Sequence, residues 1–138
     1  MEKLYIDSNI LLNVILEEEL LVDSSYKLLC GIEKGVHPAV SSILTVMEIH
    51  RILQKCGKKE LEIREAVERI AASGIEIIVP EREEMIAAYG LVRENRIDPA
   101  DAIHLSVALS SAQVFVTRDR ELSSKIRGLI KVKVPEEI

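Results

Sequence analysis

Short apolar runs alternate with helical patterns along the whole chain, and this alternation constrains the fold more than any other feature. No Asn-Gly or Asp-Gly pair is present to close a tight hairpin between two of the runs. Strands separated by helices usually pair in parallel, and the helices then cover both faces of the sheet. The sequence therefore predicts a three-layer α/β/α fold with a mostly parallel, short-stranded central sheet. The expected strands are 3–7, 36–40, 75–79, 114–117 and 130–134.

Capping residues, glycines and prolines mark the ends of the expected helices. Gly35, Gly57 and Gly74 each follow a helical pattern, in the position where glycine commonly ends a helix. Pro38 lies inside the second apolar run and has no N–H for a strand ladder, so it predicts an edge strand or a poor one. The expected helices are 8–17, 23–34, 41–55, 58–73, 81–95, 98–111 and a short helix from 119.

Size and charge limit the classes of function. The 138 residues suit a single domain, 1–138, and 48% hydrophobic residues are enough for a substantial core. The formal net charge is −5. A protein that bound nucleic acid through phosphate neutralisation alone would be basic. This chain therefore either avoids nucleic acid or relies on bound cations, and its few aromatic residues argue against a base-stacking surface.

The sequence carries no sign of secretion or membrane insertion. The first apolar run is interrupted by Asp7 and Asn13, which is unlike a secretory signal. No uninterrupted apolar run approaches the ~20 residues that a membrane span needs. Cys30 and Cys56 lack metal-ligand spacing, so we expect buried free thiols in a reducing compartment. These features predict a soluble cytoplasmic protein.

Four carboxylates lie at positions that a plain fold would not require. Asp7 ends the first apolar run, and Asp119 lies just past the run 114–117. Glu48 interrupts the apolar stretch 43–49, and Asp101 lies in the first turn of a largely apolar helix.

Each of these residues also has an ordinary structural interpretation. Asp7 suits a turn, and Asp119 suits the cap of a short helix. Glu48 suits a solvated helix position beside Arg51. The segment from Asp98 at the N-cap to Asp101 at N3 resembles a capping arrangement, with Pro99 at N1.

The combination is more informative than any single acid. The carboxyl ends of parallel strands meet at one edge of a sheet, so Asp7 and Asp119 are expected side by side, with Asp101 near them. Clustered carboxylates repel one another, and divalent cations remove that repulsion. Oxygen ligands suit Mg²⁺ or Mn²⁺, and two such ions ~4 Å apart can activate water and stabilise the leaving oxygen in phosphodiester cleavage.

Four segments together resemble the PIN-domain nucleases, and most of all the VapC-type toxins of VapBC toxin–antitoxin pairs. The likeness spans nearly the whole chain, in the order in which the family carries its motifs. The segments are Leu4-Tyr5-Ile6-Asp7-Ser8-Asn9-Ile10-Leu11, Thr45-Val46-Met47-Glu48-Ile49, Asp101-Ala102-Ile103-His104 and Val116-Thr117-Arg118-Asp119.

The resemblance implies a Mg²⁺- or Mn²⁺-dependent endoribonuclease. Asp7, Glu48, Asp101 and Asp119 take the acidic, metal-binding and catalytic positions of the family. The resemblance also implies a homodimer formed through helices and a small antitoxin protein as partner. Supporting roles fall to Asn9 and Thr117, and to Asp98 as a fifth carboxylate.

One histidine and several basic residues outside the acidic set also carry predictions. His104 lies on a mostly apolar helix, so we expect a half-buried, satisfied histidine and leave it out of the site. Candidate phosphate contacts are Arg51, Arg118, Arg120 and Lys125.

Two other functions remain open at this point. A catalytically weak PIN scaffold or RNA-binding module is one, although the presence of all four acids counts against it. A Mg²⁺-dependent phosphoacceptor domain is the other. That class needs paired acids after the first strand, where Asp7-Ser8-Asn9 offers one, and a lysine beyond the last strands, where Lys125 is poorly placed.

Overall fold

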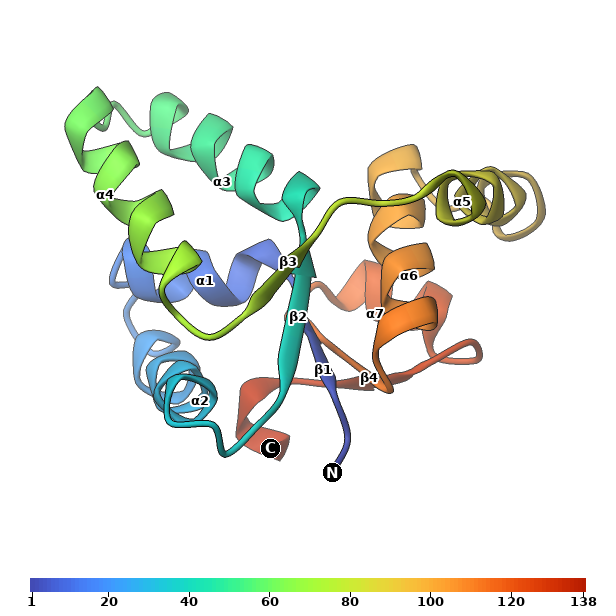
Figure 1. The fold of residues 1–138 in the computed structure, drawn as a ribbon, viewed down its shortest axis with the longest axis horizontal. Helices are drawn as coiled ribbons and strands as arrows, with labels where there is room; N and C mark the ends of the chain where they lie inside the picture. Colours follow the sequence, from blue (N-terminus) through green and yellow to red (C-terminus); the bar gives the residue numbers. More distant parts are fainter.

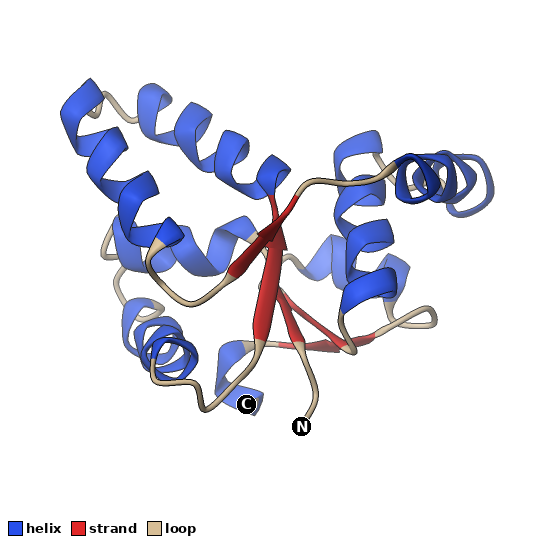
Figure 2. Ribbon diagram, viewed as in Figure 1, coloured by secondary structure: helices blue, strands red, loops and turns tan.

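A computed structural model describes all residues from 1 to 138. Its centre is a five-stranded sheet in the order β3-β2-β1-β4-β5, and every neighbouring pair is parallel. Figure 2 shows this sheet running between two groups of helices. The predicted three-layer α/β/α fold is therefore confirmed. The strands are β1 (Leu4–Ile6), β2 (Ala39–Ser42), β3 (Glu76–Ile78), β4 (Val114–Val116) and β5 (Lys131–Lys133).

The alternation of side chains along the strands divides the core into two parts. Each part packs against one of the two groups of helices in Figure 1. Leu4 and Ile6 of β1 face four helices, whereas Tyr5 between them faces three others. The first group is α1 (Ser8–Ile15), α2 (Val22–Glu33), α3 (Ile43–Lys55) and α4 (Glu60–Ala71). The second is α5 (Arg82–Asn95), α6 (Pro99–Ser111) and α7 (Arg120–Ile126), and a short 3-10 turn, η1 (Pro135–Glu137), ends the chain. None of these helices has the length and hydrophobicity that crossing a membrane requires.

The second strand differs most from the prediction. The run 36–40 was expected to form an edge or poor strand because of Pro38. Instead β2 begins at Ala39, after the proline, and pairs with both β1 and β3. Pro38 needs no N–H there, and its carbonyl accepts a hydrogen bond from the backbone N–H of Leu4 at 2.9 Å. The edge prediction was therefore wrong, because the proline precedes the ladder instead of interrupting it.

Helix ends agree with the sequence in most places. Gly35 and Gly57 have φ of 79° and 78° just after α2 and α3, as expected for glycines that end helices. Ser42 caps α3 by accepting the N–H of Leu44 at 3.1 Å. The first helix ends at Ile15 instead of 17, and α2 begins at Val22 without a side-chain cap.

The cysteines also depart from expectation. Both thiols are free, as predicted, but Cys56 is exposed and Cys30 is half-buried. The interpretation of both as buried filler was therefore wrong.

Arg118, just past β4, joins four segments through its guanidinium. Nε donates to Oδ1 of Asn13 at 2.8 Å, and a second nitrogen donates to both carboxylate oxygens of Glu136 at 2.9 and 3.0 Å. The third nitrogen donates to the hydroxyls of Ser24 at 2.8 Å and Ser25 at 3.2 Å. The Arg118 cluster thus ties α1, α2 and η1 to the end of β4.

We expect Arg118→Ala to lower the free energy of unfolding by about 2–3 kcal/mol, because it removes several charge-assisted hydrogen bonds and strips partners from buried Asn13 and Ser25. Urea denaturation measures this loss. Arg120→Ala is the matched control, since that side chain is exposed and should cost less than about 0.5 kcal/mol. Equal stability of the two variants would contradict the role assigned to the cluster.

Candidate active site

Two central strands deliver polar residues to one edge of the sheet. Asp7 follows β1 directly and Thr117 follows β4, and these strands are neighbours with Ile6 opposite Val116. The backbone N–H of Asp7 donates to the carbonyl of Val116 at 3.1 Å, which keeps the two ends in register. This is the carboxyl edge, where ligands collect in open α/β sheets.

Hydrogen bonds fix the carboxylate of Asp7 in one orientation. Its Oδ2 accepts from the Thr117 hydroxyl at 2.7 Å and from Nδ2 of Asn9 at 3.1 Å. Its Oδ1 accepts the N–H of Ser8 at 2.8 Å, at the start of α1. Asn9 is itself held, because its Oδ1 accepts the N–H of Arg118 at 3.0 Å. Asn9 and Thr117 therefore support Asp7 directly.

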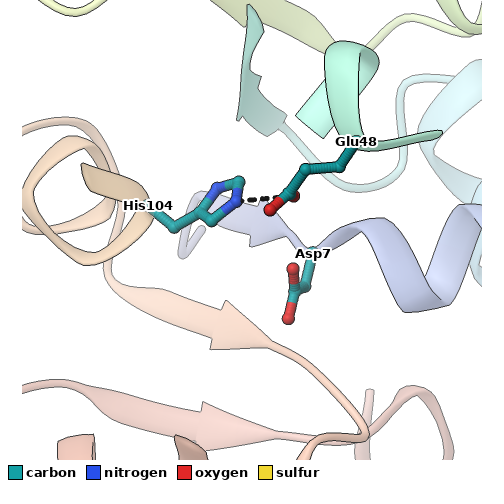
Figure 3. Close-up of side chains that lie close together, drawn as sticks. All are labelled: Asp7, Glu48 and His104. Atoms are coloured by element: carbon teal, nitrogen blue, oxygen red, sulfur yellow. Dashed lines mark hydrogen bonds and ion pairs between the residues drawn. The ribbon is translucent and has the colours of Figure 1, made fainter. Parts of the chain in front are cut away.

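Glu48 and His104 face each other from α3 and α6, close to Asp7 (Figure 3). Nε2 of His104 lies 2.8 Å from Oε1 of Glu48, and Nδ1 is hydrogen-bonded to the Tyr5 hydroxyl at 2.6 Å. One ligand atom each from Asp7, Glu48 and His104 lie within 4.8 Å of one another. The packing of α3 against the edge of the sheet thus brings Glu48 to Asp7.

His104 was expected to be a satisfied, half-buried histidine outside the site. Both of its nitrogens have partners, as expected, but the side chain is only 1% exposed, and it lies beside Glu48 and Asp7. Glu48 in turn does not pair with Arg51, the partner that its sequence position suggested. One sequence signal was available, because His104 is three residues after Asp101 and so shares its helix face.

The charge balance around His104 favours the imidazolium. Burial by itself lowers the pKa of His104. The hydrogen bond to Glu48 and the negative charges of Glu48, Asp7 and Asp101 outweigh that effect, so the pKa is raised. The Nε2–H then donates to Oε1 of Glu48, which holds this side chain beside Asp7.

Asp101 lies at the same site, half-buried in the first turn of α6. Burial raises its pKa to about 6, and the negative charges of Asp7, Asp119 and Asp98 add to the shift. Burial also raises the pKa of Asp7, with a further contribution from Glu48. The acids are thus close enough to oppose one another's ionisation.

Asp119 and Asp98 lie at the rim of the site. Asp119 caps α7 through Oδ1, which accepts the N–H of Leu122 at 3.0 Å, so its capping interpretation is confirmed. Its own N–H donates to Thr117 at 3.1 Å. Asp98 occupies the N-cap of α6 but makes no side-chain capping bond, so the expected capping arrangement is not formed there. Its negative charge contributes to the raised pKa of Asp101.

The donor set suits a hard divalent cation. Two side chains, Asp7 and Asp101, have pKa values raised by burial and by neighbouring carboxylates, and a cation would reverse that effect. The tightest geometric group contains His104 in place of Asp101. Both nitrogens of His104 are engaged, however, one by Tyr5 and the other by Glu48.

Solved structures with the same fold include several toxin–antitoxin assemblies. A toxin–antitoxin complex from Klebsiella pneumoniae is 23% identical, with a TM-score of 0.68, and the match covers 97% of this chain and 98% of that one. VapBC2 from Rickettsia felis, bound to a promoter DNA fragment, is 19% identical, with a TM-score of 0.71 and coverage of 96% and 98%. VapBC-1 from nontypeable Haemophilus influenzae is 16% identical, with a TM-score of 0.70 and coverage of 97% and 98%.

Sequence comparison identifies the family. No protein with a curated description matches this sequence significantly. The family model of the PIN domain matches residues 4–127, which include every acid of the site. The chain therefore belongs to the PIN domain family, as its motifs predicted.

Proposed function

We propose that this chain is a metal-dependent endoribonuclease, built as a single PIN domain over residues 1–138, and that it is the toxin of a toxin–antitoxin pair. The observation that carries the proposal is the gathering of Asp7, Glu48 and Asp101 at the carboxyl edge of the sheet in a PIN-family chain. Membership of this family also favours a nuclease over a phosphoacceptor domain.

Asp7, Glu48, Asp101 and Asp119 are the proposed ligands of Mg²⁺ or Mn²⁺. When bound, such an ion lowers the pKa of water and stabilises charge on phosphate oxygens. Thr117 and Asn9 hold Oδ2 of Asp7, so this carboxylate meets a phosphodiester in a fixed orientation. His104 does the same for Glu48. The side chains thus orient the reacting groups, and none of them is a nucleophile.

Three further properties belong to the proposal. The toxin–antitoxin assemblies with the same fold support an antitoxin partner, and a cavity of about 330 Å³ with apolar residues of α1–α4 in its lining offers a place for a partner segment. Exposed Met85, Ile86 and Tyr89 on α5 support a homodimer through helices. A toxin of this kind would act on RNA in the cytoplasm.

We expect Asp7→Asn or Asp101→Asn to abolish RNA cleavage while the fold is retained. Each change removes one charge from a self-repelling cluster, so the metal-free protein should be as stable as wild type or more stable. Cleavage of labelled RNA with Mn²⁺ and with EDTA measures activity, and thermal unfolding measures stability. Ribonuclease activity retained in the double variant would disprove the assignment.

We expect His104→Asn to weaken Mn²⁺ binding by about tenfold or more, because changes in residues that hold metal ligands commonly cost this much. The amide of asparagine lies near the position of Nδ1. It can therefore still hydrogen-bond to the Tyr5 hydroxyl, but it cannot reach Glu48. His104→Gln is the matched control, since its amide extends to the position of Nε2. Isothermal titration compares the two, and equal affinities would exclude a positioning role for His104.

We expect Mn²⁺ affinity to fall about tenfold between pH 7 and pH 5. The pKa of Asp101 is raised to about 6, so this side chain is mostly ionised at pH 7 and mostly protonated at pH 5. Protons then compete with the cation for the same oxygens. Isothermal titrations with Mn²⁺ between pH 7 and pH 5 measure this change in affinity. Asp101→Asn is the control, and its affinity should lose this pH dependence. Unchanged affinity in the wild type would place Asp101 outside the ligand set.

A further inference from the structure

The acidic site borders a cleft of the opposite charge. The cleft has a volume of about 810 Å³ and lies beside α7 and the loop that precedes it. None of its lining residues is acidic, in contrast to the cavity among α1–α4, which Glu17, Glu62 and Glu65 help to line. The residues of this basic cleft are Leu21, Thr117, Arg118, Arg120, Ser123, Ser124, Arg127 and Val134.

Thr117 connects the basic cleft to the acidic site. Its hydroxyl donates to Oδ2 of Asp7 at 2.7 Å, and the same residue lines the cleft. A group in the cleft is therefore separated from the proposed catalytic carboxylate by one side chain. A chain of phosphates could place one phosphate at the acids and a neighbouring phosphate in the cleft.

Only two of the three arginines are free to bind a ligand. The guanidinium of Arg118 is engaged by Asn13, Ser24, Ser25 and Glu136, and Glu136 offsets its charge.

Arg120 and Arg127 are the free pair. They are exposed, and their side chains make no hydrogen bond or ion pair.

The serines of the cleft add no free donor. The Ser123 hydroxyl donates to the carbonyl of Asp119 at 2.7 Å, and that of Ser124 donates to the carbonyl of Glu121 at 2.8 Å. Lys125, an expected phosphate contact, lies 3.5 Å from Glu121 and does not line the cleft. The uncompensated positive charge therefore comes from Arg120 and Arg127.

We propose that Arg120 and Arg127 form a phosphate-binding subsite for the RNA strand that flanks the cleaved bond. This inference rests on the proposed ribonuclease function and deepens it. Guanidinium groups bind phosphate through paired hydrogen bonds, and such contacts hold a nucleic acid in place without reading its bases. In a chain of net charge −5, a local pair of free arginines also determines on which side of the acids the strand lies.

The test is the double variant Arg120→Gln/Arg127→Gln, assayed on a labelled single-stranded RNA with Mn²⁺. We expect KM to rise about tenfold while kcat stays within twofold, because these arginines bind substrate and do not touch the reacting atoms. The dependence of log KM on log salt should weaken by about 0.7, the value for one single-strand phosphate that the variant no longer binds. Mn²⁺ affinity should not change.

The matched control is Arg64→Gln/Arg82→Gln, which removes the same charge from exposed positions on α4 and α5. Equal KM and equal salt dependence in the two double variants would overturn the subsite while leaving the ribonuclease intact. If the wild type does not cleave RNA, the proposed function fails. The subsite is then judged by fluorescence anisotropy with the same RNA, where weaker binding by Arg120→Gln/Arg127→Gln alone supports it. Equal binding, or no binding by the wild type, overturns it.

Discussion

Mutual repulsion among carboxylates at one edge of the sheet is the constraint on which the rest of the structure depends. Asp7 is only 7% exposed, and its pKa is raised by burial and by Glu48. The pKa of Asp101 is likewise raised by burial and by the negative charges of Asp7, Asp119 and Asp98. A fold selected only for stability would replace these acids with neutral residues. The presence of these acids at one edge of the sheet therefore supports the proposed metal site there.

The hydrogen bonds around the acids compensate for part of that repulsion. Thr117 and Asn9 donate hydrogen bonds that stabilise the ionised form of Asp7, and His104 is hydrogen-bonded to Glu48. The support extends beyond the site, because the N–H of Arg118 holds Asn9 while its guanidinium binds α1, α2 and η1. The orientation of Asp7 is therefore coupled to the packing of the helices on one face of the sheet.

The sequence predicted the fold well because each element carries a local signal. Apolar runs, capping serines and glycines are all read within a few neighbouring residues, as with Ser42 and Gly35. The prediction was wrong where one sequence feature is compatible with two different structures. Pro38 indicated an edge strand, but a proline just before a strand is equally compatible with an interior one.

The site was harder to predict because its key contacts join distant segments. The placement of Asp7 and Asp119 near one edge follows from parallel strands alone. The pairing of Glu48 with His104 links residues 56 apart in the sequence, and it depends on how α3 and α6, from opposite faces of the sheet, approach each other at its carboxyl edge. No local pattern encodes that approach, so His104 was interpreted as a satisfied, half-buried histidine outside the site.

The segment from Thr117 to Arg120 shows how a short stretch of chain can serve several needs at once. Thr117 orients Asp7, Arg118 ties helices together, Asp119 caps α7, and Arg120 lines the basic cleft. Thr117, Arg118 and Asp119 lie between the end of β4 and the start of α7 at Arg120, where successive side chains point in different directions. The two arginines of this segment therefore differ in how their positive charge is used. Arg118 is neutralised within the fold, whereas Arg120, two residues later, is left to meet a ligand.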